Sequence, residues 1–266
     1  MKRTGKRLVM LMTVLFLLVM GTGATIAWGS VTVPTKGRLY IYNLETKKWE
    51  KTEQTFTATY SKDGKLKKKV FGYGGSEKST TKYTWKGDYL KKITYSFSDG
   101  SSSTRTFTYK NGKPSKIVFS DITTTYTWKG NKGTAIEKME DDTNRYTLAM
   151  KNGRLVKNRD EQSQCDRTYT YYKKGLRKTY TSDWKNYKYK ITYGKNGLPK
   201  KINDGPALTT SYSWKKKEIL ITDKENGKVV SKIKWKISKT KKVSRAWNCD
   251  AYGYPVLLFE VSDFAS

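Results

Sequence analysis

An aromatic triplet returns along the chain at a constant interval. Residues 83–85, 126–128, 169–171 and 212–214 each begin and end with an aromatic side chain, and they start 43 residues apart. A step of 43 back from Tyr83 reaches residues 40–42, whereas a step forward from Tyr212 falls one residue past 252–254. Self-similarity at such a period is typical of repeat architectures. The spacing therefore predicts five tandem units over residues 40–254.

The sequence inside each unit has the signs of short antiparallel strands. Residues 107–109, 189–193 and 233–237 alternate apolar and polar side chains, as half-buried strands do. Asp-Gly or Asn-Gly pairs at residues 63–64, 111–112, 152–153 and 196–197 tolerate the positive φ of tight hairpin turns. Each unit is expected to hold about four strands. Residues 133–142, rich in carboxylates, are expected to form a loop with a single turn.

One face of each predicted strand is aromatic and aliphatic, and the other is Thr, Ser and Lys. A sheet with one apolar face has to cover that face. The fold class is predicted as all-β, an antiparallel meander of about five tandem 43-residue, four-stranded repeats that is curved or rolled. A β-propeller is the second interpretation, because its blades are four-stranded units of similar length. The one-sided apolar pattern favours the rolled meander.

Three segments contain a Tyr followed within a few residues by Gly and Leu, and in one of them a basic residue stands between the Gly and the Leu. Residues 60–66 contain Tyr60, Gly64, Lys65 and Leu66, and residues 171–176 and 193–198 vary the same theme. These segments resemble the YD (RHS-type) repeats of exported bacterial proteins, although the Asp that follows Tyr in that family is missing here. The resemblance implies an array of β-hairpins that forms a shell or an extended sheet. The toxin domain of the longer members of that family has no counterpart in this sequence.

The N-terminus has the three regions of a secretory signal. Lys2, Arg3, Lys6 and Arg7 precede an apolar run, and small residues follow up to Ala27, the expected cleavage site. The alternative is an uncleaved membrane anchor, which would be the protein's only contact with a membrane. The predicted organisation is a signal peptide over residues 1–27, a lead-in over 28–39, a β-repeat domain over 40–254 and a tail over 255–266. The protein is expected to be secreted or associated with the cell envelope.

The chain is strongly basic, with a formal net charge of +31. Such a charge favours polyanionic partners. Candidate anion-binding residues are the lysine runs Lys67, Lys68, Lys69, Lys91, Lys92, Lys215, Lys216, Lys217, Lys241 and Lys242. Lys86, Lys129 and Lys215 each follow an aromatic triplet directly and are expected to line one edge. Anionic cell-wall polymers or anionic surfaces are the expected partners, and nucleic acid is an unlikely partner for an exported chain.

Several kinds of catalytic and metal site lack their usual residues. The chain has no histidine, the commonest general base and metal ligand, so no cofactor, metal site or catalytic residue is predicted. Cys165 and Cys249 are an even pair in an exported chain and form a possible disulfide. Because they lie 84 residues apart, a bridge between them would require the sheet to curl or close.

The sequence therefore favours a non-enzymatic binding or structural protein of the cell envelope or extracellular space. In this hypothesis a basic face interacts with anionic polymers or surfaces. The alternative is a wall- or glycan-acting hydrolase that uses loop carboxylates, since paired carboxylates can cleave glycosidic bonds. Its candidate groups are Glu137, Glu140, Asp141 and Asp142 in one cluster and Asp160, Glu161 and Asp166 in another. A lipid carrier with an apolar concavity is a third, weaker hypothesis.

Overall fold

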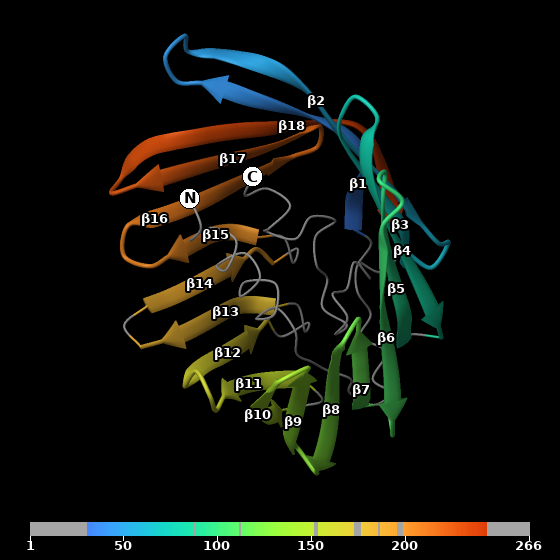
Figure 1. Cartoon of the computed structure of the whole chain (residues 1–266). Helices are drawn as coiled ribbons and strands as arrows, with labels where there is room; N and C mark the ends of the chain where they lie inside the picture. The colour runs from blue at the N-terminus through green and yellow to red at the C-terminus, as the bar shows by residue number, and fades with distance from the viewer. Residues whose placement is uncertain are drawn as a thin grey trace.

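The computed structural model describes residues 31–87, 89–111, 113–151, 154–172, 177–185, 187–195 and 199–243. These residues form one sheet of 18 antiparallel strands, drawn in Figure 1. The strands are β1 (Val31–Asn43), β2 (Lys48–Tyr60), β3 (Leu66–Gly74), β4 (Glu77–Lys86), β5 (Tyr89–Phe97), β6 (Ser102–Lys110), β7 (Lys113–Phe119), β8 (Ile122–Lys129), β9 (Lys132–Met139), β10 (Asp142–Lys151), β11 (Arg154–Asp160), β12 (Cys165–Tyr171), β13 (Arg177–Trp184), β14 (Tyr187–Tyr193), β15 (Pro199–Asp204), β16 (Leu208–Lys215), β17 (Glu218–Glu225) and β18 (Lys228–Val243).

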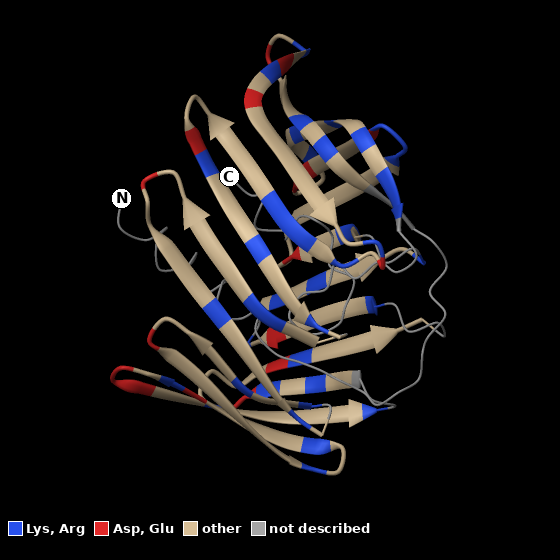
Figure 2. Cartoon of the chain, turned by 90° about the vertical axis from the view of Figure 1, so that its right-hand side faces the viewer, with Lys and Arg blue, Asp and Glu red and all other residues tan. Residues whose placement is uncertain are grey.

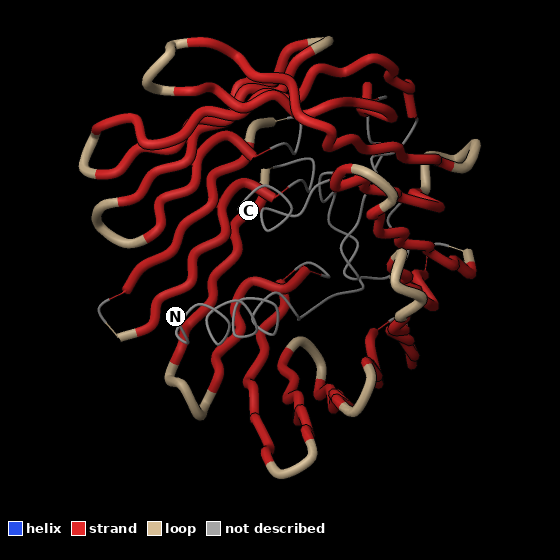
Figure 3. Tube along the Cα trace, turned by 45° about the horizontal axis from the view of Figure 1, so that its top comes forward, coloured by secondary structure: helices blue, strands red, loops and turns tan. Residues whose placement is uncertain are grey.

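The sheet closes into a barrel. Each strand pairs with its neighbours along the chain, and β18 pairs in turn with β1. In this seam Leu39 lies opposite Trp235, and Ile41 lies opposite Ile233. Figure 3 shows the described strands running around the barrel, with the turns at its two ends. With strands about 4.8 Å apart and tilted by about 40°, a barrel of this strand number is about 35 Å across.

Alternate side chains point into and out of the barrel. On β6 the buried Phe107 stands between the exposed Thr106 and Thr108, and on β8 the buried Tyr126 stands between Thr125 and Thr127. Because the described residues form a single closed sheet, the buried alternate residues mark its inner face. A continuous cluster of Leu, Ile, Phe, Tyr, Trp and Met side chains runs along that face. The outer face carries mainly Thr, Ser and Lys.

A repeated side-chain contact ties neighbouring strands together near one end of the barrel. The indole Nε1 of Trp85 donates a hydrogen bond to the carbonyl of Leu66, at 2.9 Å. Trp128 makes the same contact with Pro114 at 2.9 Å, and Trp214 with Pro199 at 2.7 Å. The hydroxyls of Tyr109 and Tyr171 donate to the carbonyls of Leu90 and Leu155 in the same way. These aromatic residues thus satisfy strand-end carbonyls as well as covering the inner face.

The structure confirms the predicted all-β antiparallel meander, which rolls up. It corrects the prediction that the sheet consists of tandem four-stranded repeats. The triplets lie on β4, β8, β12 and β16, but the strand pairing is continuous and does not divide the sheet into tandem four-stranded repeats. Tyr40 lies on β1, three strands before β4, so the count of four fails there. The propeller interpretation was also wrong, because blades would be separate sheets.

One local expectation was wrong as well. Residues 133–142, expected to form a loop, belong mainly to β9 and to the start of β10. There Ala135 and Glu137 point inward and are buried, so the alternation was present but was masked by the acidic side chains. Strand β1 begins at Val31, inside the segment expected to be a lead-in, because residues 31–41 pair with β18. Ala27 and the tail over 255–266 lie outside the described residues.

Candidate functional site

All ten predicted anion-binding lysines lie toward one end of the barrel. This end holds the turns that join each even-numbered strand to the next odd-numbered one, together with the end of β18. The run over 67–69 opens β3, Lys91 and Lys92 lie near the start of β5, and the run over 215–217 spans the β16–β17 turn. Lys241 and Lys242 are at the end of β18. Segments up to about 170 residues apart in sequence therefore contribute to one surface, which we call the basic rim.

More basic residues complete the basic rim. They are Lys62, Lys65, Lys86, Lys110, Lys113, Lys129, Lys132, Lys151, Arg177, Lys178, Lys195 and Lys200. Lys86, Lys129 and Lys215, predicted to line one edge, are all on this rim. Among the described residues the rim holds two carboxylates, and both are paired with lysine. Asp63 is 2.8 Å from Lys65, and Glu218 is 3.7 Å from Lys215.

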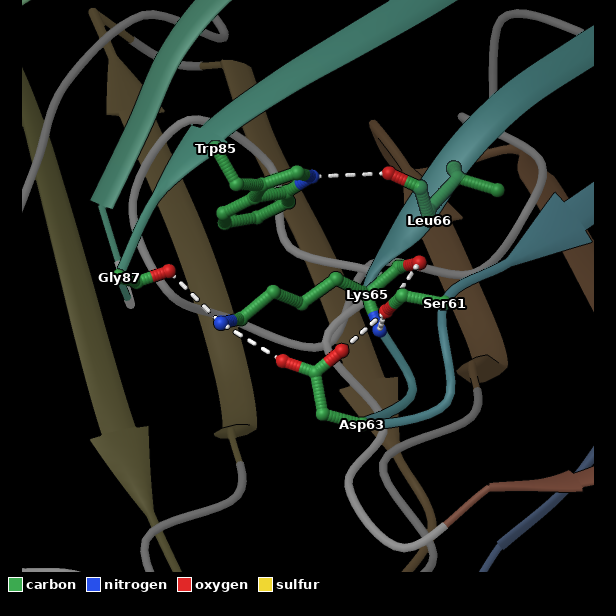
Figure 4. A network of polar contacts seen from close by, with 6 residues as sticks. All are labelled: Ser61, Asp63, Lys65, Leu66, Trp85 and Gly87. Atoms are coloured by element: carbon green, nitrogen blue, oxygen red, sulfur yellow. Dashed lines mark hydrogen bonds and ion pairs between the residues drawn. The ribbon is translucent and has the colours of Figure 1, made fainter.

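Some rim lysines hold the turns together. Lys65 Nζ donates to the carbonyl of Gly87 at 2.7 Å and pairs with Asp63, which also accepts a hydrogen bond from Ser61 (Figure 4). The hydrogen bond from Lys65, together with that from Ser61, lowers the pKa of Asp63 below its ordinary value. Lys113 Nζ repeats the arrangement, donating to the carbonyl of Gly130 at 2.5 Å. Each contact connects two successive turns of the rim and so orders its surface.

The ten predicted lysines differ in their surroundings. Lys69 is buried, and its ammonium lies 5.1 Å from the centroid of the Phe71 ring. Lys91 lies 5.2 Å from the centroid of the Tyr109 ring. Lys241 donates to the carbonyls of Tyr60 and Ser61, beside a shallow depression between β2 and β18. Lys67, Lys68, Lys92, Lys215, Lys216, Lys217 and Lys242 are exposed and present their charge to solvent.

The opposite end of the barrel carries the reverse pattern. Its turns join each odd-numbered strand to the next even-numbered one, and every such turn has a carboxylate within two residues. The carboxylates of this acidic rim include Glu45, Glu50, Glu53, Glu77, Asp99, Asp121, Glu140, Asp141, Asp142, Glu161, Asp183, Asp204 and Glu225. Lysines are interspersed among them, as at Lys47, Lys78 and Lys185. Figure 2 shows red segments at the hairpin tips of this end.

The acidic rim was missed because its carboxylates are scattered through the sequence. A signal was available, since acidic and basic residues alternate from one turn to the next along the chain. In an antiparallel meander, successive turns lie at opposite ends of the sheet. Assigning odd-numbered and even-numbered turns to opposite ends of the sheet therefore separates the acidic turns from the basic ones. Runs of like charge in the sequence do not reveal this separation.

The carboxylates considered for hydrolysis do not form an open pair. Glu140 and Asp141 lie in an exposed turn, whereas Glu137 is buried and accepts hydrogen bonds from Tyr146 at 2.9 Å and Thr124 at 3.4 Å. Burial raises the pKa of Glu137. Asp160 is also buried and lies 3.7 Å from Arg167. Asp166 pairs instead with Lys157 at 3.0 Å and with Arg159 at 3.6 Å. Glu137 and Asp160 therefore serve as buried polar groups of the barrel wall, whereas Asp166 belongs to a more exposed ion-pair cluster.

The remaining predicted sites lie partly outside the described residues. Cys165 is buried on β12, with its sulfur 3.2 Å from Ser182 Oγ. Cys249 is not among the described residues, so the disulfide stays a prediction that mass mapping under non-reducing conditions can test. Within the described chain, no group of three or more His, Cys, Asp or Glu side chains is arranged to hold a metal ion. The described residues also contain no helix long and apolar enough to cross a membrane.

Comparison with known proteins gives distant similarities of fold to solved structures. No family model matches the chain, and no curated protein matches it. Among solved structures, the chain is similar to a porin-like protein from Bacteroides uniformis, at 12% sequence identity and a TM-score of 0.32. The match covers 79% of this chain and 97% of that one. At this level of similarity, the closed barrel rests on the strand pairings of the chain itself.

The resemblance to YD repeats was wrong. The chain forms one closed barrel rather than an array of hairpin repeats, because the strand pairing is continuous from β1 to β18 and closes on itself. The residues that these segments have in common with YD repeats have a local cause. Gly64 takes a positive φ of 87° in the β2–β3 turn, and Leu66 is the first buried residue of the strand that follows. Any antiparallel meander with tight turns favours such residues at these places.

Proposed function

We propose that this protein is an exported, non-enzymatic barrel that binds anionic polymers or anionic surfaces through its basic rim. The observation that supports this proposal is the gathering of the lysine runs at one end of the barrel, away from most of the carboxylates. Each lysine near an anionic surface contributes on the order of 1 kcal/mol. An ordered ring of such charges can therefore bind a polyanion without a dedicated pocket.

The geometry of the rim favours an extended ligand. Successive turns follow one another every two strands, or about 12 Å along the rim of a tilted barrel. This spacing exceeds the Debye length of about 8 Å at physiological salt, so each turn acts mainly on the charges directly beside it. A polymer with many negative groups can contact several turns at once. A small anion can contact one turn, and we expect it to bind weakly.

The polar outer wall argues against a role as a channel embedded in lipid. A barrel that spans a bilayer presents an apolar band to the lipid. Here Lys82, Thr106, Thr108, Thr125 and Lys190 are exposed on the outer wall. We therefore propose that this wall faces water, and that the protein acts outside the membrane or at its surface. The hydrolase alternative finds no supporting geometry in the carboxylates described above.

The proposal is tested by sedimentation of the protein with purified cell walls, with and without their anionic polymers, across a salt series. We expect binding that requires the polymers and is lost as salt is raised from low to moderate concentration. The informative variant is Lys215→Gln/Lys216→Gln/Lys217→Gln on the basic rim, which should weaken binding about tenfold or more.

A matched control removes the same number of charges from the other rim. Lys48→Gln/Lys78→Gln/Lys228→Gln changes exposed lysines of the acidic rim and lowers the net charge equally. It should bind nearly as well as the unmodified protein. Equal losses in the two variants would mean that net charge alone drives binding, and the basic rim would then not be the site.

A further inference from the structure

The acidic rim also gathers the exposed apolar side chains. Among the described residues, the large hydrophobic side chains that remain exposed are Ile41, Leu44, Tyr73, Phe97, Trp184, Tyr187 and Val230, each between 38% and 51% exposed. All of them lie in the turns of the acidic rim or within a few residues of those turns. Apolar groups that cluster at one end of a protein mark an interaction surface.

The acidic rim is built to hold these groups in place. Gly75 N donates to Glu53 at 2.9 Å, Asn43 Nδ2 donates to Glu50 at 2.9 Å, and Ser101 N donates to Asp99 at 2.8 Å. Tyr187 donates its hydroxyl to Asp204 across the β13–β14 and β15–β16 turns. The rim therefore presents ordered carboxylates beside aromatic and aliphatic groups. A basic partner would complement these carboxylates.

We propose that the acidic rim docks on the basic rim of a second copy of this chain. The two rims carry opposite predominant charge, and they have the same circumference because the same 18 strands end at both. A ring about 35 Å across and about 10 Å thick offers roughly 1,000 Å² to a partner. A specific interface of standard size buries about 800 Å² on each side. The contact is head-to-tail, so it leaves a free rim at each end and can continue into an open stack.

The net charge of +31 sets the conditions for this contact. Two copies repel each other at long range, but at about 0.15 M salt such repulsion is screened beyond roughly 8 Å. Opposite charges on facing rims lie closer than that, and burial of the apolar side chains does not weaken with salt. We therefore expect association at physiological salt, and we expect less of it at very low salt.

The test is sedimentation velocity of the full chain at about 0.15 M salt over a range of protein concentrations. Two variants raise the net charge by the same amount. Glu140→Gln/Asp141→Asn removes carboxylates from the acidic rim, and Asp63→Asn/Glu218→Gln removes them from the basic rim. The first should raise the dissociation constant roughly threefold to tenfold, as expected for loss of two exposed ion pairs. The second should leave association unchanged or strengthen it.

Further variants separate stacking from polymer binding. Tyr73→Ser/Phe97→Ser should weaken association and leave polymer binding unchanged, whereas the 215–217 variant should weaken both. A sedimentation coefficient that stays that of the monomer at every concentration would overturn the proposal. Equal weakening by the two carboxylate variants would overturn it too, because that result indicates general charge repulsion. Neither outcome bears on polymer binding by the basic rim.

Discussion

Glu137 is a carboxylate placed inside an otherwise largely apolar wall. It is 3% exposed, its two oxygens accept hydrogen bonds from Tyr146 and Thr124, and the charge of Asp160 acts on it. Burial is the largest cause of its raised pKa, because the charged form loses its hydration. The folded protein therefore binds this proton more tightly than the unfolded chain does. Asp160 differs from Glu137 in that its negative charge is compensated by Arg167.

The raised pKa of Glu137 predicts a pH-dependent stability. The stability that Glu137 contributes through this tighter proton binding is fully present below the ordinary Glu pKa of 4.5. It is lost as the pH rises through the higher pKa that Glu137 has in the folded protein. The variant Glu137→Gln is always neutral, so it should have a higher Tm than the unmodified protein at pH 7 and an equal Tm near pH 4. Thermal unfolding across this range tests the prediction. The exposed Glu140→Gln is the control, and an equal gain in that variant would contradict the explanation.

Strand ends in this barrel are secured by a side chain on the next strand. Trp128 on β8 illustrates the device, because its indole nitrogen bonds to Pro114 while Lys113 lies 5.3 Å from its ring centroid. The ring also lies against Gly133 on β9, where an added Cβ would come within 2.6 Å of it. The indole of Trp128 on β8 therefore contacts residues of both neighbouring strands, β7 and β9. The aromatic triplets thus recur because each provides a polar group that reaches back to a strand-end carbonyl.

The loss of this single hydrogen bond should be measurable. Trp128→Phe keeps a ring in the site and removes the donor, which leaves the carbonyl of Pro114 without it. We expect a loss of about 1–2 kcal/mol in the free energy of unfolding, measured by urea denaturation. Trp184→Phe, at an exposed position on the acidic rim, should change the free energy of unfolding by less than about 0.5 kcal/mol. Similar losses in both variants would contradict the role given to the hydrogen bond.

Closure of the barrel joins the two ends of the sheet and removes its edges. The first and last strands would otherwise expose unpaired backbone groups that invite aggregation. Gly37 lies at this seam, where a Cβ would be 2.4 Å from Phe56 Cε1 and 3.0 Å from the carbonyl oxygen of Lys236. The second contact is with backbone, which cannot move without disturbing the β1–β18 pairing. The seam therefore depends on the absence of a side chain at this position.

Gly37→Ala should accordingly destabilise the whole barrel. We expect a loss of about 1–3 kcal/mol from overpacking and a fall in Tm of about 2–4 °C for each kcal/mol. Calorimetry and light scattering on heating measure both the fall and any increase in aggregation. Gly72→Ala is the comparison, because its Cβ would meet only the side-chain oxygen of Thr55, at 3.0 Å. If Gly72→Ala were the more damaging variant, the seam would not be the sensitive place.

The separation of charge along the barrel axis depends on the same closed meander. Turns of odd and even parity lie at opposite ends, so alternating acidic and basic turns become two rims of opposite character. The position of each lysine along the chain says nothing about its distance from the others. Lys68 and Lys242 lie at the same end because antiparallel strands alternate in direction, and closure of the barrel brings the strands that carry them close together.

The sequence by itself determined the class of the strands and much of their placement. Alternation around Phe107 and Ile191, and the Gly-containing turns, identify strands because those signals depend on side chains a few residues apart. The lysine runs were likewise visible as charged segments. At residues 133–142 the alternation was masked, because an inward-facing carboxylate replaces an apolar residue of the pattern.

Only the tertiary structure decided the closure and the count of 18 strands, and so which turns are neighbours around each rim. The pairing of β1 with β18 joins residues about 200 positions apart, and no local pattern records it. The period of 43 residues describes which strands carry an aromatic triplet, but it does not determine where the sheet ends. That point is set by strand tilt and twist summed over the whole barrel, since each pair of strands contributes only a small rotation toward closure.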